Sequence, residues 1–421
     1  MNRVVVIGAG FGGLSCAKEL ADAPAHVTLV DQHNFHTFQP LLYQVATAGL
    51  NAADVAYSVR GIFQRQDNVD FRQATVTGID WDSRTLELDG GAQPPLVFDK
   101  LVVAAGASAA FFGIDGAEEH SFPLYTLVDA IALRNHVLDR FEAADADPAL
   151  IDAGALTFVV VGGGATGVEV AGALAELFAM VLRKDFRHLD VSKARIVLVE
   201  MAPALLGPFK PRSQQHARDT LERRGVEVRT GEAVQRVEPT RVVLAGGEEI
   251  ACHTLVWAAG VRANPLADAL GVETTRGGRI VVGSDLRIPG HPDAFAVGDV
   301  AAIGDVKHEG MVLPMLAQVA IQSGRHAARA MERTWSGKAP KRFKYFNKGT
   351  MATIGRNAAV AELPGGLLLS GVLGWLSWLG LHLIYLVGFR NRLSVLMNWG
   401  WNYLTWDRGP RLIIRPDDRR P

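Results

Sequence analysis

Cysteine is scarce in this 421-residue chain, which contains only Cys16 and Cys252. The two residues lie far apart, and neither belongs to a Cys-x-x-Cys pair. A disulfide framework or a cysteine-ligated metal site needs more thiols at closer spacing. The sequence therefore predicts no disulfide and no metal site, and it excludes a redox centre made of paired thiols.

Net charge is almost absent, because 43 Lys and Arg oppose 44 Asp and Glu. The charges are nevertheless uneven, since residues 338–421 hold 13 Lys and Arg against four Asp and Glu. A basic end on an acidic body points to an anionic surface, either a membrane or nucleic acid. This end is more apolar than an electrostatic footprint requires, so we expect no nucleic-acid partner.

The sequence shows no leader peptide, because an apolar strand pattern already begins at Arg3. We therefore expect the body of the protein to stay in the cytoplasm. The hydrophobic fraction of 48% supplies a sizeable core. At roughly 100–200 residues per domain, the length predicts two or three domains.

One pattern occurs twice in the chain. An apolar strand at residues 4–7 precedes a glycine turn and a helical stretch, and the next strand ends at Asp31. A second apolar strand at residues 156–161 again precedes a glycine turn and a helix, and the next strand ends at Glu200. This duplication predicts an α/β protein with two Rossmann-like dinucleotide-binding domains.

Both turns fit the pattern G-x-G-x-x-G, with Gly8, Gly10 and Gly13 in the first and Gly162, Gly164 and Gly167 in the second. The first glycine allows the tight turn, the second lets the backbone approach a pyrophosphate, and the third lets helix and strand pack closely. The N-terminus of the following helix then presents free N–H groups and a partial positive charge to the phosphates. The alternative is a glycine turn that binds no nucleotide. The occurrence of two such turns, each followed by an acid, disfavours this alternative.

The acidic residues suit the ribose of a nucleotide. Asp31 lies 18 residues beyond Gly13, close to the ~20 expected. Glu200 lies 33 residues beyond Gly167, and residues 184–193 account for the difference as an insertion. A carboxylate at this place accepts hydrogen bonds from ribose hydroxyls and repels a 2′-phosphate, which favours NADH over NADPH. A third acid, Asp299, follows Gly298 at the end of an apolar strand and could bind the ribityl chain of a flavin.

With these motifs the chain resembles the type II NADH:quinone oxidoreductases (alternative NADH dehydrogenases), which are flavoproteins with two dinucleotide-binding domains of the glutathione-reductase type. The resemblance covers nearly the whole chain. It extends to the flavin-proximal segment 33–46, to the strand-to-glycine crossovers 101–106 and 257–261, and to the AQxAxQ stretch at 317–322. Ala165 stands where proline is common in the family, a change that removes no needed group.

The resemblance implies FAD as the cofactor and NADH as the substrate. It implies a discontinuous FAD-binding domain at 1–118 and 263–340, an NADH-binding domain at 119–262, and a C-terminal segment at 341–421 for membrane anchoring and dimerisation. The cofactor contacts that it predicts are Gly8, Ala9, Gly10, Phe11, Gly12, Gly13, Asp31, Gln32, His36, Pro40, Val76, Ala105, Gly106, Gly162, Gly164, Thr166, Gly167, Glu200, Ala259, Gly260, Gly298, Asp299, Ala317 and Gln318.

Two further assignments concern the quinone and the proton. Gln318 and Gln322 share one helix face, and the resemblance makes them quinone-binding residues. The alternative is an ordinary helix whose glutamines face water. Glu169 is the candidate catalytic acid, and the resemblance links it to proton delivery. The alternative for Glu169 is favourable electrostatics near a helix start.

The C-terminal segment contains a run without charged residues at 365–389. Its six glycines and internal tryptophans favour helices lying in the membrane surface over a bilayer span. We expect a peripheral, monotopic protein on the cytoplasmic face of the cell inner membrane. A soluble dimer interface is the alternative, and a homodimer is compatible with both.

The predicted reaction is hydride transfer from NADH to FAD, followed by transfer of two electrons to a membrane quinone, either menaquinone or ubiquinone. With at most one span we expect no proton pumping. The rival interpretations are an NAD(P)H oxidase or ferredoxin-type reductase on the same scaffold, and a flavin-bearing NADH sensor with little turnover.

Overall fold

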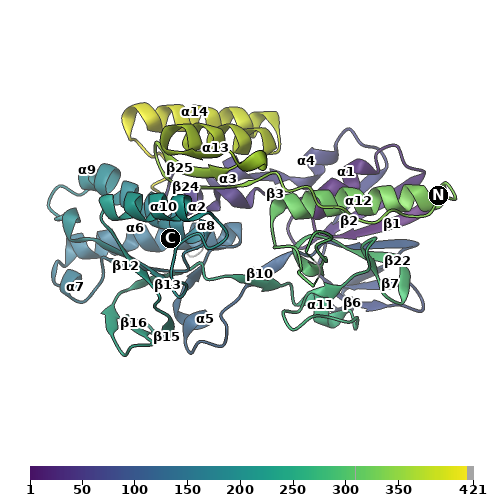
Figure 1. The fold of residues 1–421 in the computed structure, drawn as a ribbon, viewed down its shortest axis with the longest axis horizontal. Coiled ribbons are helices and arrows are strands. Elements are labelled where there is room, and N and C mark those ends of the chain that lie inside the picture. The colour runs from purple at the N-terminus through teal and green to yellow at the C-terminus, as the bar shows by residue number, and fades with distance from the viewer. Residues whose placement is uncertain (309, 415–421) are drawn as a thin grey trace, which may run out of the picture. The chain divides into compact units, whose positions relative to one another are not determined.

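The computed structural model describes residues 1–308 and 310–414, so the last seven residues of the basic end lie outside the described residues. The chain forms two compact units (Figure 1). Unit 1 comprises Met1–His36, Tyr57–Ser108 and Val261–Lys348, and unit 2 comprises Thr37–Ala56, Ala109–Gly260 and the chain from Gly349 onward. From Gly349 onward, the C-terminal segment thus belongs to the same unit as the second glycine turn.

Unit 1 is built on a six-stranded sheet with strand order β21-β22-β9-β1-β2-β5. The strands are parallel except β21. The run 4–7 in β1 is apolar throughout because β1 lies inside the sheet and both of its faces are buried. Helices α1 and α12 pack against each other on this sheet. The bounds are β1 Asn2–Ile7, β2 Ala25–Asp31, β5 Val69–Gln73, β9 Lys100–Val103, β21 Arg287–Ile288, β22 His291–Ala296, α1 Phe11–Glu19 and α12 Ala317–Trp335.

Unit 2 contains a five-stranded parallel sheet with strand order β11-β18-β12-β13-β14. Helix α8 follows the second glycine turn, and its last part continues as a π-helical stretch through Leu177–Leu182. The predicted duplication of strand, turn, helix and strand is confirmed. The bounds are β11 Phe122–Pro123, β12 Thr157–Val161, β13 Arg195–Glu200, β14 Val226–Thr230, β18 Thr254–Trp257, α6 Leu127–Ala146, α8 Ala165–Glu176 and α10 Pro211–Arg223.

Smaller elements complete both units. A three-stranded antiparallel sheet in each unit consists of β6 Val76–Asp80, β7 Thr85–Leu88 and β8 Gln93–Val97 in unit 1, and β15 Val234–Glu238, β16 Arg241–Leu244 and β17 Glu249–Ala251 in unit 2. Short helices include α2 Leu42–Ala46, α3 Ala52–Val55, α4 Val59–Phe63, α5 Ala117–His120, α7 Ala149–Asp152, α9 Arg183–Asp185 and α11 Leu266–Ala269.

The C-terminal segment is a β-hairpin with a third strand, followed by two helices. Strands β24 (Thr350–Gly355), β25 (Ala358–Glu362) and β26 (Leu368–Ser370) form one antiparallel sheet. β24 packs on α8, and α13 (Gly371–Tyr385) packs on β25. The uncharged run 365–389 is therefore divided among a turn, a short strand and a 15-residue helix, because Gly365, Gly366 and Gly371 adopt positive φ angles.

Helix α14 (Phe389–Thr405) is tied to the segment 51–56 by buried polar groups. The amide of Asn391 donates to the carbonyl oxygens of Ala53, Asp54 and Ala56 at 3.0–3.1 Å. The carboxylate of Asp54 in turn accepts from the Ser394 hydroxyl at 2.6 Å. Because these groups are largely withdrawn from water, their hydrogen bonds specify where the helix lies.

By length and composition, one helical stretch of the described chain could cross a bilayer, namely Ala165–Asp185. It begins at the second glycine turn and packs against β24, and 67% of its most apolar 18 residues are buried within the protein. Its apolar character is explained by this core position. Helix α13 is apolar but shorter.

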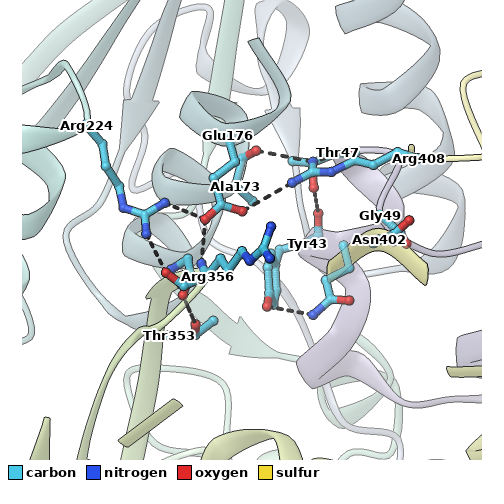
Figure 2. Close-up of polar contacts among 12 residues, drawn as sticks. Tyr43, Thr47, Gly49, Ala173, Glu176, Arg224, Thr353, Arg356, Asn402 and Arg408 are labelled. Carbon is cyan, nitrogen blue, oxygen red and sulfur yellow. Dashed lines mark hydrogen bonds and ion pairs between the residues drawn. The ribbon is translucent and has the colours of Figure 1, made fainter. Parts of the chain in front are cut away.

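A largely buried carboxylate joins α8 to the C-terminal segment (Figure 2). Glu176 forms ion pairs with Arg224 and, at 3.3 Å, with Arg408, and it accepts the backbone N–H of Arg356. The backbone runs so close to this group that a Cβ on Gly355 would lie 2.5 Å from both Arg224 and Glu176. Glu176 thereby holds the β24–β25 turn and the chain after α14 onto α8.

Replacing Glu176 by Gln should lower the free energy of unfolding by about 3 kcal/mol, because two largely buried guanidinium groups would lose their counter-charge. Glu222→Gln is the matched control, since Glu222 pairs with Arg218 at the exposed surface and should cost less than about 1 kcal/mol. Urea unfolding of both variants measures the difference. Equal losses would show that the Glu176 cluster adds nothing beyond a surface pair.

Candidate functional site

The first glycine turn lies between β1 and α1 in unit 1. Gly8 has a φ of +99°, and a Cβ at this position would lie 2.4 Å from the carbonyl oxygen of Ala104. A Cβ on Gly13 would lie 1.8 Å from the carbonyl oxygen of Gly8. Gly10 differs, because nothing lies within 4 Å of a Cβ there. The turn is closed toward the protein and open where a pyrophosphate would bind.

The second turn, between β12 and α8 in unit 2, repeats this geometry. Gly162 has a φ of +108°, and its Cβ would lie 2.4 Å from the carbonyl oxygen of Ala258. The Gly167 Cβ would again lie 1.8 Å from the first glycine, and Gly164 again faces open space. Neither α1 nor α8 has a side-chain cap or an acid in its first turn. Both helix N-termini therefore keep their N–H groups and positive dipole ends for an anion.

The two acids hold their own glycine turns in the same way. Asp31 accepts the N–H of Ala9 at 2.7 Å and that of His33 at 2.7 Å. Glu200 accepts the N–H of Gly163 at 2.5 Å and that of Ala202 at 2.6 Å. Burial raises the pKa of Asp31, and its two backbone hydrogen bonds oppose this shift. The 33-residue spacing to Glu200 thus does not change the position of the acid relative to its turn.

His36 adds a buried polar atom to the first turn. Its Nδ1–H donates to the carbonyl oxygen of Ala9 at 2.9 Å, and burial lowers the pKa of the ring to about 4, so the imidazole is neutral. The other ring nitrogen, Nε2, is buried and has no partner among the described residues. A neutral imidazole nitrogen accepts a hydrogen bond, so this atom fits a ligand hydroxyl beside the turn.

Helix α12 packs closely on Gly298, which follows β22. The Gly298 N–H donates to the Ser323 hydroxyl at 3.0 Å, and a Cβ on Gly298 would lie 3.1 Å from Ala320. The small side chain of Ala320 in the AQxAxQ stretch therefore lets α12 pack closely against Gly298. The predicted Asp299 lies next to this contact, in the 3₁₀ turn Gly298–Val300.

The other predicted cofactor residues occupy turns and strand ends. Ala105 and Gly106 follow β9, and Ala259 and Gly260 follow β18. The remaining positions are Gln32 directly after β2, Pro40 in the 3₁₀ turn Gln39–Leu41, Val76 at the start of β6, Phe11 and Gly12 in α1, Thr166 in α8, and Ala317 at the start of α12.

Gln318 and Gln322 lie on one face of α12, as the spacing predicts, and both bind the backbone of the following segment. The Gln318 carbonyl accepts the N–H of Lys348 at 3.0 Å. The Gln322 amide donates to the carbonyl oxygen of Phe346 at 2.9 Å and accepts its N–H at 3.0 Å. The pair holds the extended chain 346–348 along the helix.

Glu169 lies in α8, beyond its first turn, and its side chain is half-buried. Desolvation raises the pKa of its carboxyl to about 8, although Thr353 donates its backbone N–H at 3.3 Å. The indole N–H of Trp378 also opposes this rise in the Glu169 pKa, although it makes no hydrogen bond of ordinary length and angle. The protonated form therefore persists at neutral pH, which suits a group that delivers a proton.

Sequence reasoning did not identify the residues around Glu169. Tyr43 comes from segment 37–56, Thr353 from β24, and Trp378 from α13. These segments share no motif and meet only through the tertiary fold. The tryptophan content of the last 80 residues was the one available signal, and it indicated a membrane interface equally well.

Comparison with known proteins agrees with this geometry. The family model for pyridine nucleotide-disulphide oxidoreductases matches residues 2–324, and the model for the NDH2 C-terminal domain matches residues 347–405. Type II NADH:quinone oxidoreductase NdhA of Mycobacterium tuberculosis is 41% identical over 429 residues, which cover 98% of this chain and 89% of the relative. Type II NADH:quinone oxidoreductase of Staphylococcus aureus is 34% identical over 371 residues, covering 86% and 90%.

A solved structure, NDH2 from Plasmodium falciparum in complex with NADH, superposes with a TM-score of 0.89 and covers 98% of this chain and 100% of its own. At 19% identity this likeness shows the shared fold. The two acid-held glycine turns, the matching C-terminal domain and the identity over nearly the whole length lead to one conclusion. The chain belongs to the type II NADH:quinone oxidoreductase family.

Proposed function

We propose that this protein is a non-proton-pumping NADH:quinone oxidoreductase that uses FAD. The observation that carries the proposal is the duplicated turn, in which a carboxylate holds a glycine turn whose middle glycine faces open space. Two such turns in one chain fit two dinucleotides. The bound flavin would accept hydride from the nicotinamide and return two electrons to a quinone.

The residues of unit 1 fit the FAD. The N-terminus of α1 would bind the pyrophosphate, Asp31 the ribose, and the buried Nε2 of His36 a hydroxyl of the ligand. In unit 2 the N-terminus of α8 would bind the NADH pyrophosphate. Glu200 would accept the ribose hydroxyls and repel a 2′-phosphate, which favours NADH over NADPH.

Gln318 and Gln322 are proposed to form part of the quinone site. Both side-chain amides hold segment 346–348 in place. They would therefore shape the proposed quinone-binding surface and also present polar groups to the quinone. The choice between menaquinone and ubiquinone depends on groups beyond these two side chains.

The C-terminal helices are proposed to lie on a lipid bilayer as a monotopic anchor on the cytoplasmic face of the inner membrane. Large apolar side chains are exposed on both helices, among them Val372, Leu373, Leu376, Leu381, Ile384, Phe389, Leu393, Leu396, Met397, Trp401 and Leu404. Arg390 and Arg392 lie beside them in sequence. An exposed apolar patch of this kind marks a membrane or protein contact, and a homodimer could share it.

Replacing Leu396 and Leu404 together by Asp should strongly reduce flotation with phospholipid vesicles, because both side chains are more than half exposed on α14. NADH oxidation with a water-soluble quinone should stay near the wild-type rate, since neither side chain is part of the hydrophobic core. Unchanged flotation would remove this helix from the membrane contact.

Steady-state kinetics test the proposed reaction directly. The full chain, loaded with FAD, should reduce a short-chain quinone with NADH, and kcat/KM should be at least about tenfold lower with NADPH because Glu200 repels the 2′-phosphate. Oxygen consumption without quinone at a similar rate would identify an oxidase. A flavin that is reduced by NADH and then stays reduced with quinone would identify a sensor.

Glu169→Gln should keep FAD and NADH binding and lower quinone turnover roughly 100-fold, because the amide cannot donate the proton. Wild-type turnover should fall as pH rises through about 8, where Glu169 loses its proton, and the variant should lack this fall. A wild-type pH profile retained in the variant would assign the ionisation to another group.

The same shift affects stability. Between the ordinary carboxyl pKa of 4.5 and about 8, folded Glu169 keeps a proton that the unfolded chain releases, so its contribution to stability is lost as pH rises through this window. In Glu169→Gln this pH-dependent loss should be absent from urea unfolding curves.

A further inference from the structure

A cavity of about 110 Å³ lies within unit 2, next to the groups that surround Glu169. Its lining includes Tyr43, Gln44, Thr353, Trp375, Trp399 and Arg408. Thr353 donates its backbone N–H to the Glu169 carboxylate, and the Tyr43 hydroxyl is within electrostatic range of the same carboxylate. Since a water needs roughly 10–15 Å³ of such volume and two or more polar partners, this cavity can hold several waters.

A directional chain of hydrogen bonds ends at Tyr43. The indole N–H of Trp399 can only donate, and it donates to the Gln44 carbonyl oxygen at 2.8 Å. The orientation of the Gln44 amide is therefore determined, and its NH₂ group donates to the Tyr43 hydroxyl at 2.8 Å. The Tyr43 oxygen is thus an acceptor in this contact, and its own proton must point elsewhere.

The proton of the Tyr43 hydroxyl has no protein acceptor among the described residues. Tyr43 is buried, and desolvation together with the nearby Glu169 and Glu176 charges raises its pKa well above the ordinary value. The hydroxyl therefore stays protonated and can conduct a proton only by giving one and taking one at the same time. The cavity offers room for water beside the hydroxyl, and the Glu169 carboxylate is close enough to influence the Tyr43 pKa, so these two are the candidate partners.

We propose that Tyr43 is a relay that passes a proton from cavity water to the Glu169 carboxylate, oriented by Gln44 and by Trp399 of the C-terminal helix α14. The inference rests on the proposed role of Glu169. NADH, one proton and a quinone give NAD⁺ and a quinol, so one proton per turnover must come from solution. Tyr43 gives its proton to the carboxylate left after Glu169 has donated and regains one from water, and no electrons move in this step.

The structure ties the relay to the C-terminal segment. Trp399 lies on the helix that Asn391 fixes to segment 51–56, and Asn402 of the same helix donates to the carbonyl oxygen of Gly49 at 3.1 Å. Trp399 packs against Trp378, whose ring in turn meets that of Tyr43 edge-on. Tyr43, Asn402, Arg356 and Arg408 line the same cavity, and Figure 2 shows them together with Glu176. Trp399 is therefore a positioning residue for the hydroxyl.

Stopped-flow kinetics of the FAD-loaded full chain separate the two half-reactions. In Tyr43→Phe, flavin reduction by NADH should stay within about twofold of wild type, and reoxidation by a water-soluble quinone should slow at least about tenfold. The solvent deuterium isotope effect on reoxidation should increase, because proton delivery becomes limiting. Trp399→Phe keeps the ring and removes only the N–H donor, so it should show the same changes to a smaller degree.

Trp81→Phe is the matched control, since it also removes an indole N–H, which donates to the carbonyl oxygen of Leu270 in unit 1 at 2.9 Å, and it should behave as wild type. If quinone reoxidises the flavin of Tyr43→Phe at the wild-type rate with an unchanged isotope effect, the relay is overturned. Slow reoxidation of Glu169→Gln in the same experiment would show that the proposed role of Glu169 still stands. A raised KM for quinone with unchanged kcat would also overturn the relay. Wild-type flavin that quinone fails to reoxidise would instead refute the proposed function itself.

Discussion

In each unit, a carboxylate at the end of one parallel strand accepts backbone N–H groups from the glycine turn that ends the neighbouring strand. Asp31 and Glu200 make these contacts with nearly the same geometry, although their distances in sequence from the third glycine differ. The carboxylate fixes the turn, the turn fixes the start of the helix, and the helix N-terminus supplies the anion-binding groups. Each proposed dinucleotide position follows from this arrangement.

Helix α8 connects the second of these sites to the C-terminal segment. Its first residues form the turn, Glu169 lies one turn further, and Glu176 ends the α-helical part. Thr353 binds Glu169, and Arg356 and Arg408 bind Glu176, so both acids are held by residues from the last quarter of the chain. The segment proposed to contact the membrane is thus joined to the helix proposed to bind NADH, and its Trp378 lies near the acid proposed to deliver the proton.

Local patterns predicted the parts of the protein that depend on local geometry. The two turns, their acids and the α/β duplication could be read from the sequence because each needs a few residues at set spacing. The cluster around Glu176 and the cavity beside Tyr43 could not, since their residues come from segments up to several hundred positions apart. The glutamines of α12 show the same limit. Their shared face was predictable, but the hydrogen bonds to Phe346 and Lys348 depend on the course of an extended segment without a pattern of its own.

The C-terminal run is a further case. Its composition indicated helices at a membrane surface, and the positive φ angles of its glycines, which composition does not reveal, divide it into turn, strand and helix. The anchoring of α14 through Asn391 and Asp54 likewise needs the three-dimensional fold. Chemistry that depends on these contacts, including the orientation of Tyr43, follows from the structure alone.

An anaerobic titration of the purified chain with NADH tests the central claim that the two turns hold a flavin and a nicotinamide nucleotide. The account predicts one FAD per chain, bleached completely by one equivalent of NADH. A folded chain that binds no flavin when FAD is supplied, or a bound flavin that NADH does not reduce, would contradict it.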